Sequence, residues 1–63
     1  MKVGNVYYSK QKNSAWLVWH EITAIEGNIV TLSHYGKDTD AFESKFTKKE
    51  IFYSLRKGIL IPA

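Results

Sequence analysis

The stretch AWLVWHEITAIEGNIVTLSHYG, residues 15–36, constrains the fold of this 63-residue chain more than any other part of the sequence. Two runs rich in β-branched and aromatic residues, which favour strands, flank the turn-forming tripeptide Glu26-Gly27-Asn28. A two-residue loop at Gly27 and Asn28 would place apolar side chains opposite each other on one side of a hairpin. The pairs expected across it are Ile25 with Val30, Ala24 with Thr31, and Thr23 with Leu32. The stretch therefore predicts one long antiparallel hairpin.

Alternation along the first run of this hairpin leaves apolar side chains on both faces of the strand. One face would carry Leu17, Trp19 and Glu21, and the other would carry Trp16, Val18, His20 and Ile22. A strand of this length, with Glu21 on an otherwise apolar face, predicts a bulge or a strong bend between His20 and Thr23. Through such a bend one strand can serve both sheets of a small barrel.

The rest of the chain predicts shorter elements around the hairpin. We expect a first strand at 5–8, a polar connection at 9–14, a turn at 36–40, a short strand at 41–46 and a closing strand at 58–62. Pro62 stands at the end of the closing strand, where it interrupts no ladder.

The pattern after residue 46 changes from alternation to helical spacing. Thr47 and Glu50 have the spacing of a capping box, and Gly58 lies where a helix would end, so we expect a helix of about three turns. Its apolar face would carry Ile51, Phe52 and Leu55, and its solvent face would carry Lys48, Lys49, Tyr53 and Arg56.

The order of these elements predicts a mainly β fold in one small domain, residues 1–63. In so short a chain, an antiparallel sheet is stable if it curls on itself or packs against a helix. The expected architecture is a small, strongly bent antiparallel sheet or barrel of about five strands, with one short helix before the last strand.

Three segments carry a resemblance to a known family: VGNVYY at 3–8, W-x-V-x-x-x-I-x-x-I-E-G-N-x-V-T-L at 16–32, and FTKKEIF at 46–52. Together they resemble the Src-homology-3-like small barrels found in KOW and Tudor domains and in many short bacteriophage proteins. That family usually has a single short turn of helix before its last strand, whereas the helical signal here is longer. The resemblance implies a binding module, because members of the family generally bind nucleic acids or protein segments and seldom catalyse reactions.

The composition argues against secretion and membrane insertion. Without cysteine the chain has neither disulfides nor thiolate metal ligands, one of which a secreted domain of this size usually needs, so we expect a cytoplasmic protein. The first ten residues lack the apolar core of a signal peptide, and no run approaches the roughly 20 apolar residues that cross a bilayer. We expect no membrane partner.

His20, Glu21 and His34 are the only residues that point to acid–base or metal chemistry. Paired strands could bring His34 near His20 or Glu21, and a carboxylate contact would raise the pKa of an imidazole. A metal site normally needs three or four ligands, however, and the third is missing. No nucleotide-binding fingerprint is present, and the hairpin explains Gly27. We therefore expect no catalytic residues, no metal, no cofactor and no enzymatic activity.

Aromatic rings and cations give the clearest functional signal. The chain has two Trp, four Tyr and three Phe residues, more rings than so small a domain can bury, and a net charge of +3. Exposed rings stack on bases or anchor a protein, and cations contact phosphates. The residues expected to bind a partner are Lys10, Lys12, Trp19, Tyr35, Lys48, Lys49, Tyr53 and Arg56.

Two functional hypotheses follow from this surface. The first is a small nucleic-acid-binding protein that uses the basic and aromatic side chains. The alternative is a phage or mobile-element accessory protein that binds and modulates a host protein or forms a homodimer. The sequence leaves open the choice between DNA, RNA and protein.

Overall fold

The computed structural model describes residues 1–10, 17–36 and 39–63 of the chain. Its elements are β1 (Val6–Lys10), β2 (Leu17–Glu26), β3 (Ile29–Gly36), β4 (Thr39–Thr47), α1 (Lys48–Arg56) and β5 (Ile61–Pro62). All five strands belong to one antiparallel sheet with the order β4-β3-β2-β1-β5. The prediction of a mainly β fold with about five strands and one helix before the last strand is confirmed.

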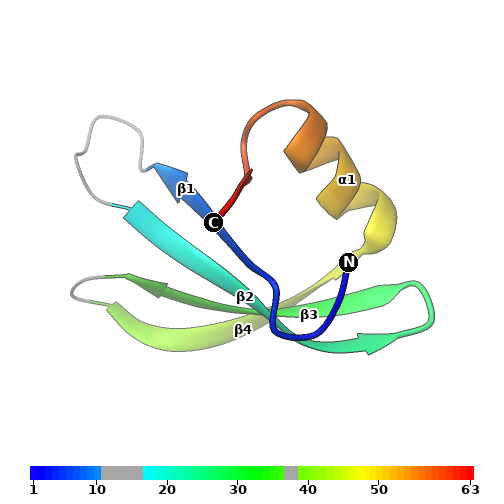
Figure 1. Cartoon of the computed structure of the whole chain (residues 1–63). Coiled ribbons are helices and arrows are strands. Elements are labelled where there is room, and N and C mark those ends of the chain that lie inside the picture. Colours follow the sequence, from blue (N-terminus) through cyan, green and yellow to red (C-terminus); the bar gives the residue numbers. More distant parts are fainter. Residues whose placement is uncertain (11–16, 37–38) are drawn as a thin grey trace.

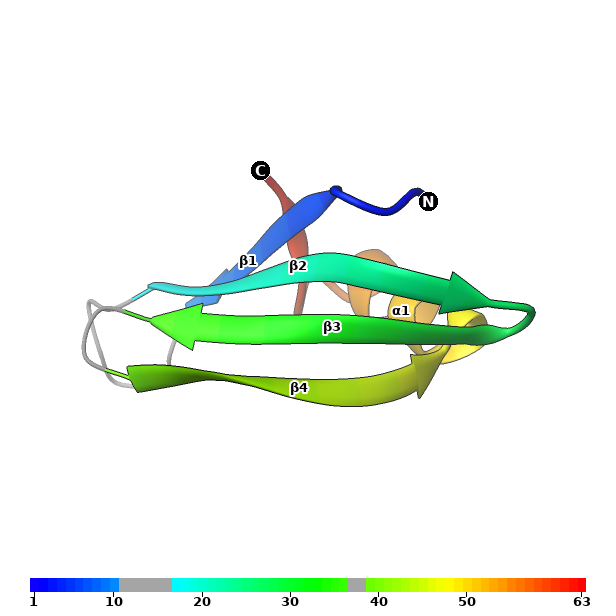
Figure 2. The same ribbon diagram turned by 90° about the horizontal axis from the view of Figure 1, so that it is seen from below.

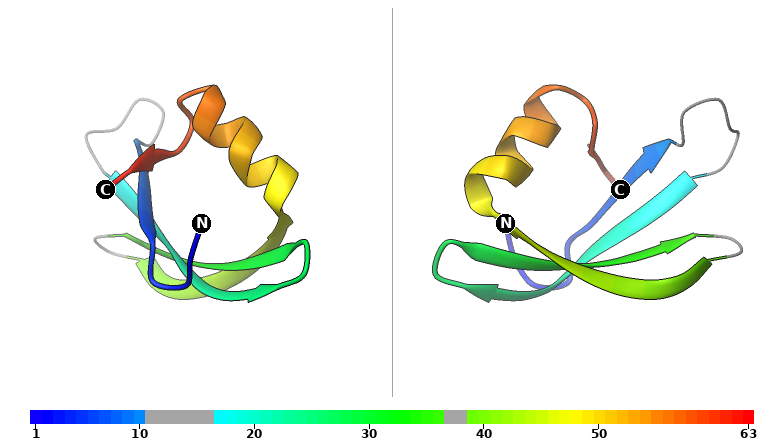
Figure 3. Two further views of the ribbon diagram at one scale, coloured as in Figure 1. Left: turned by 45° about the vertical axis from the view of Figure 1, so that its right-hand side comes forward. Right: turned by 180° about the vertical axis from the view of Figure 1, so that it is seen from behind.

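The sheet is strongly bent. Strands β2, β3 and β4 lie side by side, while β1 leaves their plane and pairs with only the first half of β2 (Figure 2). Among the described residues the two edge strands, β4 and β5, do not pair with each other. Helix α1 lies across the open side between them (Figures 1 and 3). We refer to the face of the sheet that α1 covers as the inner face and to the opposite face as the outer face.

The hairpin of β2 and β3 contains the expected bulge. Ile25 pairs with Val30 and Ala24 with Thr31, as predicted, but the partner of Leu32 is Ile22 rather than Thr23. The prediction for Thr23 is wrong because Thr23 is the extra residue of the bulge, with no partner on β3. The extra residue interrupts the alternation of side chains along β2, so Ile22 and Ile25, which are three residues apart, both face inward. At the tip of the hairpin Gly27 has φ +59°, which glycine adopts without strain.

The outer elements differ in length from the expectation. Strand β1 extends to Lys10, into the segment expected to be a polar connection, and the rest of that connection, 11–14, lies outside the described residues. Strand β4 is longer than the predicted 41–46, since Thr39 and Asp40 from the expected turn belong to it. Strand β5 is shorter than the predicted 58–62, and its Pro62 pairs with Tyr7.

Helix α1 begins with the predicted capping box. The Glu50 N–H donates to Thr47 Oγ1 at 3.2 Å, and the Thr47 N–H donates to Glu50 Oε1 at 2.9 Å. The helix ends before Gly58, whose φ is +75°. Its inward stripe is narrower than predicted: Ile51 is buried and Leu55 packs against the core, whereas Phe52 is 52% exposed. Phe52 was wrongly placed because it lies about 100° around the helix from Ile51, beyond the reach of the sheet.

The core is small and lies between the inner face and α1. Its buried hydrophobic residues are Tyr7, Ile22, Val30, Leu32, Ile51 and Leu60. Helix α1 and the segment that follows it supply the cover, through Ile51 and Leu60. In the part of the chain that the structure describes, no helix has the length and apolar character needed to cross a membrane.

Candidate functional site

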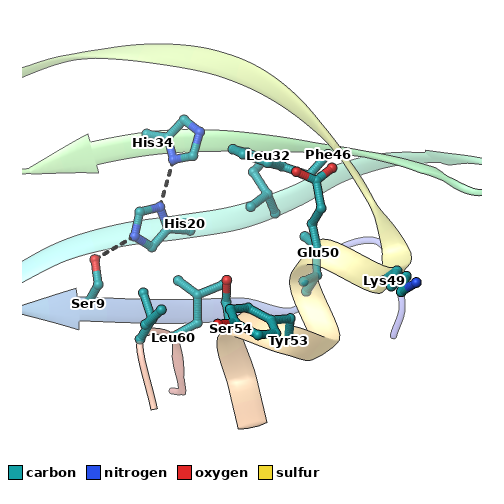
Figure 4. Close-up of a pocket in the computed structure, with 12 residues that line it drawn as sticks. Ser9, His20, Leu32, His34, Phe46, Lys49, Glu50, Tyr53, Ser54 and Leu60 are labelled. Carbon is teal, nitrogen blue, oxygen red and sulfur yellow. Dashed lines mark hydrogen bonds between the residues drawn. The ribbon is translucent and has the colours of Figure 1, made fainter. Parts of the chain in front are cut away.

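A pocket of about 500 Å³ lies between the inner face of the sheet and α1 (Figure 4). Its walls come from every layer of the fold. The lining residues are Ser9, His20, Leu32, His34 and Phe46 from the sheet, Lys49, Glu50, Ile51, Tyr53 and Ser54 from α1, and Ile59 and Leu60 after the helix. Most of this surface is apolar, and the polar side chains of the sheet gather on one side of it.

Two histidines form the polar centre of this pocket. His20 and His34 are register partners on β2 and β3, and their Nδ1 atoms lie 2.6 Å apart. Since a contact this short between two nitrogens requires one proton, one ring donates and the other accepts. His20 Nε2 also makes a 2.8 Å hydrogen bond with Ser9 Oγ. Ser9, His20 and His34 therefore form one hydrogen-bonded chain across three neighbouring strands (Figure 4).

Aromatic side chains hold His34 in place. Its ring lies 4.9 Å from the ring of Phe42, its register partner on β4, and 6.0 Å from that of Phe46, both measured between centroids. The side chain of His34 is buried, and every buried polar side-chain atom among the described residues has a hydrogen-bond partner. The histidine pair is thus a hydrogen-bonded, titratable group inside an apolar site.

Burial lowers the pKa of both imidazoles below the ordinary 6.5, and the neighbouring His34 lowers the pKa of His20 further. The sequence left open a contact between a histidine and Glu21 that would raise an imidazole pKa, and this is wrong. Alternation along β2 turns Glu21 to the outer face, away from both rings. The pair can accept only one further proton, because a second would place two N–H groups on the same 2.6 Å contact.

The described residues contain no cluster of three or more His, Cys, Asp or Glu side chains that could hold a metal ion. The histidine pair alone offers two ligands, fewer than protein metal sites normally have.

The residues predicted to bind a partner divide into two groups. Lys48, Lys49, Tyr53 and Arg56 lie on α1, where Lys48 is half-buried and the others are exposed. Trp19 and Tyr35 are half-buried register partners on β2 and β3. The sheet separates the two groups, because Trp19 and Tyr35 alternate with the inward-facing histidines and so lie on the outer face. Lys12 and the side chain of Lys10 lie outside the described residues.

The outer face carries an apolar row. Ile61, Tyr8, Trp19 and Tyr35 follow one another across β5, β1, β2 and β3, and the rings of Tyr8 and Trp19 have centroids 5.6 Å apart. The next row along the strands contains Glu21 and Glu43, each paired with Ser33. The aromatic side chains of the outer face are therefore bordered by carboxylates.

The sequence left open that paired strands bring His34 near His20 or Glu21, and the structure pairs it with His20; the pocket itself was not predicted. The signal was present in the bulge, because a one-residue shift beyond Thr23 is what brings His34 opposite His20.

Comparison of the chain with protein-family models, with curated proteins and with solved structures finds no match.

Proposed function

We propose that this chain is a non-enzymatic module that binds nucleic acid on the exposed side of α1. The observation that carries the proposal is the charge of this helix and its cap. The four cations on it are Lys48, Lys49, Arg56 and Lys57. The one acidic residue of the segment, Glu50, accepts hydrogen bonds from the backbone N–H and side-chain hydroxyl of Thr47, so its charge lies at the helix N-terminus. The resemblance to Src-homology-3-like barrels supports the same class of function.

Exposed rings accompany these cations. Phe52 is 52% exposed and Tyr53 is 54% exposed, and Lys57 Nζ lies 5.7 Å from the centroid of the Tyr53 ring. Bases stack on such rings with little sequence preference, which contributes about 1–3 kcal/mol per base, while the cations contact the phosphates. Together they suit a single-stranded nucleic acid better than a duplex, whose bases are already stacked.

The outer face is a poorer place for phosphates. Trp19 and Tyr35 are half-buried, and Glu21 and Glu43 occupy the neighbouring row. Carboxylates repel the phosphate backbone, so this proposal retains the predicted residues on α1 and does not use Trp19 or Tyr35.

A titration of labelled single-stranded DNA and RNA at two salt concentrations tests the proposal. We expect binding that weakens with salt, and Lys49→Glu or Arg56→Glu should reduce the slope of log K against log salt by about 0.7 or more. The matched control is Lys45→Glu, the same change of charge at an exposed site on the outer face of β4. Equal effects of the three variants would contradict a site on α1, and absence of binding at low salt would remove the function.

The ring is tested separately from the charge. Tyr53→Ala should weaken binding about 5- to 150-fold, which corresponds to the loss of one stacked base, whereas Tyr53→Phe keeps the ring and should bind as the parent does. Similar affinities of all three proteins would exclude stacking on Tyr53.

A protein partner is the second candidate, and the outer face supports it. The apolar row of Ile61, Tyr8, Trp19 and Tyr35 on the outer face, together with the edge of β4 that pairs with no other described strand, forms the kind of surface that another chain covers. The partner would be a host protein or a second copy of the chain. Sedimentation velocity, with Ile61→Lys as the disrupting variant on the outer row, and a pull-down after nuclease treatment would detect the two cases. A monomer that recovers no protein would exclude this candidate.

A further inference from the structure

The pocket beneath α1 has the size and lining of a small-molecule site. Its volume of about 500 Å³ lies within the roughly 300–1,000 Å³ of ligand pockets. The apolar part of the wall is formed by Leu32, Phe46, Ile51, Ile59 and Leu60. Because Ile51 and Leu60 also belong to the core, this space continues the interior of the protein. Its chemistry is therefore suited to the apolar part of a ligand.

Polar groups lie on both sides of this apolar space: Ser9, His20 and His34 on the sheet, and Lys49, Glu50, Tyr53 and Ser54 on α1. Ser9, His20 and His34 lie together on the sheet, whereas Lys49 lies at the far end of the pocket near the start of α1 (Figure 4). His20 is engaged at both ring nitrogens, by Ser9 and by His34. Among the described residues no hydrogen bond reaches the Nε2 atom of His34, which ends the chain of Ser9, His20 and His34, and His34 lines the pocket.

The charges that face the pocket favour an anionic ligand. The histidine pair becomes positively charged when it gains a proton, and Lys49 is a second cation in the lining. The carboxylate of Glu50 accepts two hydrogen bonds from Thr47 at the helix cap. Tyr53 is the remaining titratable group of the lining. The other side chains packed around the pair are uncharged: Tyr7 and Ser9 from β1, and Phe42 and Phe46 from β4. Glu50 is the one acidic side chain among the lining residues, and its Oε1 accepts hydrogen bonds from Thr47.

We propose that this pocket binds a small monocarboxylate with an apolar body. The carboxylate lies at the His20–His34 pair, and the body lies against Leu32, Ile51 and Leu60. The pocket shares Lys49 and Tyr53 with the proposed nucleic-acid surface, but its polar centre, the His20–His34 pair, lies on the sheet and does not belong to that surface.

Binding of the carboxylate takes up one proton. In the singly protonated pair, one N–H lies between the two Nδ1 atoms and both Nε2 atoms carry a proton. His20 Nε2–H then donates to Ser9 Oγ, and His34 Nε2–H donates to a carboxylate oxygen. Because the bound anion favours the protonated pair, affinity for a carboxylate rises as pH falls, by at most tenfold per pH unit for one linked proton.

Three ligands of equal chain length test the proposal: octanoate, octanol and octylamine. Calorimetric titrations at pH 7.5 and 6.0 should show octanoate as the tightest ligand at pH 6.0, with an affinity that increases on going from pH 7.5 to 6.0. The affinity for octanol should not change with pH. A tighter complex with octanol or octylamine at pH 6.0, or no binding of any of the three, would overturn the proposal.

Two variants locate the site. His34→Gln should weaken octanoate binding at least tenfold at pH 6.0 and leave octanol binding unchanged. Ser54→Phe places a ring in the pocket from α1, so it should remove binding of both ligands while a thermal melt shows a folded protein. If His34→Gln does not fold, His20→Gln replaces it, because it removes the same shared proton. Octanoate binding that survives both the histidine change and Ser54→Phe would place the ligand elsewhere and contradict the proposal.

Discussion

The inner and outer faces of the sheet carry two rows of rings that lie one residue apart on the same strands. The inner row is Tyr7, His20, His34 and Phe42, and the outer row is Tyr8, Trp19 and Tyr35. Helix α1 lies over the inner face, where Tyr7 and His34 are buried, two imidazoles share a proton at 2.6 Å and burial lowers their pKa values; Phe42, on the edge strand, stays exposed. No described helix or strand covers the outer row, whose rings are half-buried and in which the ring centroids of Tyr8 and Trp19 lie 5.6 Å apart. The same strands thus carry a titratable pocket on one side and an apolar row of rings on the other.

This difference shows how much depends on which face a residue takes. Alternation assigns neighbouring residues to opposite faces, and the bulge at Thr23 reverses the assignment once along β2. In a strand with unbroken alternation, His20 and Ile22 would share one face and Ile25 would lie on the other, so one of these two sets would face outward. The bulge therefore allows one strand to supply both the pocket and the core at the hairpin end.

Deletion of Thr23 should have the largest effect, because it removes the bulge that sets which side chains of β2 face inward. Removing the bulge forces large apolar side chains of β2 out of the interior, and each contributes about 1.5–3 kcal/mol through burial. A domain of this size has a free energy of unfolding of about 3–9 kcal/mol, so we expect loss of cooperative folding. Urea unfolding followed by circular dichroism measures it. The control, Thr23→Ala, keeps the bulge and should cost less than about 1 kcal/mol; a stable deletion variant would show that the bulge is dispensable.

A matched pair of truncations compares the faces next. Ile22→Ala removes a fully buried side chain from the inner face and should lower the free energy of unfolding by about 3 kcal/mol. Ile29→Ala removes a side chain that is 40% exposed and should cost less than about 1.5 kcal/mol. Urea midpoints of the two variants and the parent give the difference. Equal losses would mean that α1 does not define the buried side of the sheet.

The pH dependence of stability tests the histidine pair. Because the folded-state pKa values lie below the unfolded value of 6.5, the unfolded chain binds more protons as pH falls below that value. The stabilisation is therefore complete above about pH 6.5 and is lost progressively at lower pH. Urea unfolding between pH 7.5 and 5.5 should show a steeper loss for the parent than for the double variant His20→Gln, His34→Gln, by up to about 1.4 kcal/mol per pH unit for one proton. Parallel profiles would contradict the assigned shift.

A double-mutant cycle on the outer row should give the smallest effect. Tyr8→Ala and Trp19→Ala remove rings whose centroids are 5.6 Å apart, and we expect a coupling energy of about 0.5–1.5 kcal/mol. The control cycle pairs Tyr8 with Tyr35, two strands away at about 10 Å, and its coupling should be near zero. Coupling of similar size in both cycles would indicate that the row packs as one unit, as an interface to another chain would.

Local signals predicted most of the scaffold. The hairpin loop at Gly27 and the capping box of Thr47 and Glu50 each depend on residues within a few positions, and both are confirmed. Phe52 was wrongly assigned to the buried face because helical spacing predicts the direction of a side chain around the helix axis, whereas its burial depends on how far the sheet extends around the helix. The length of β5 was overestimated because the backbone N–H groups of residues 58–60 donate to carbonyl oxygens at the end of α1 and not to β1.

The sequence by itself determined where strands, turn and helix form, because backbone conformation follows from short-range sterics and hydrogen bonding. It also indicated that a bulge lies between His20 and Thr23. Only the tertiary structure decided that the bulge falls at Thr23 and brings His34, rather than Tyr35, opposite His20. It also decided that α1 closes a pocket over that pair and leaves Trp19 on the other side of the sheet. The physical reason is that strand register and the position of α1 over the sheet depend on contacts between residues far apart in the chain. A shift of the register by one residue turns the buried side chains of a strand to the exposed face and the exposed ones to the buried face.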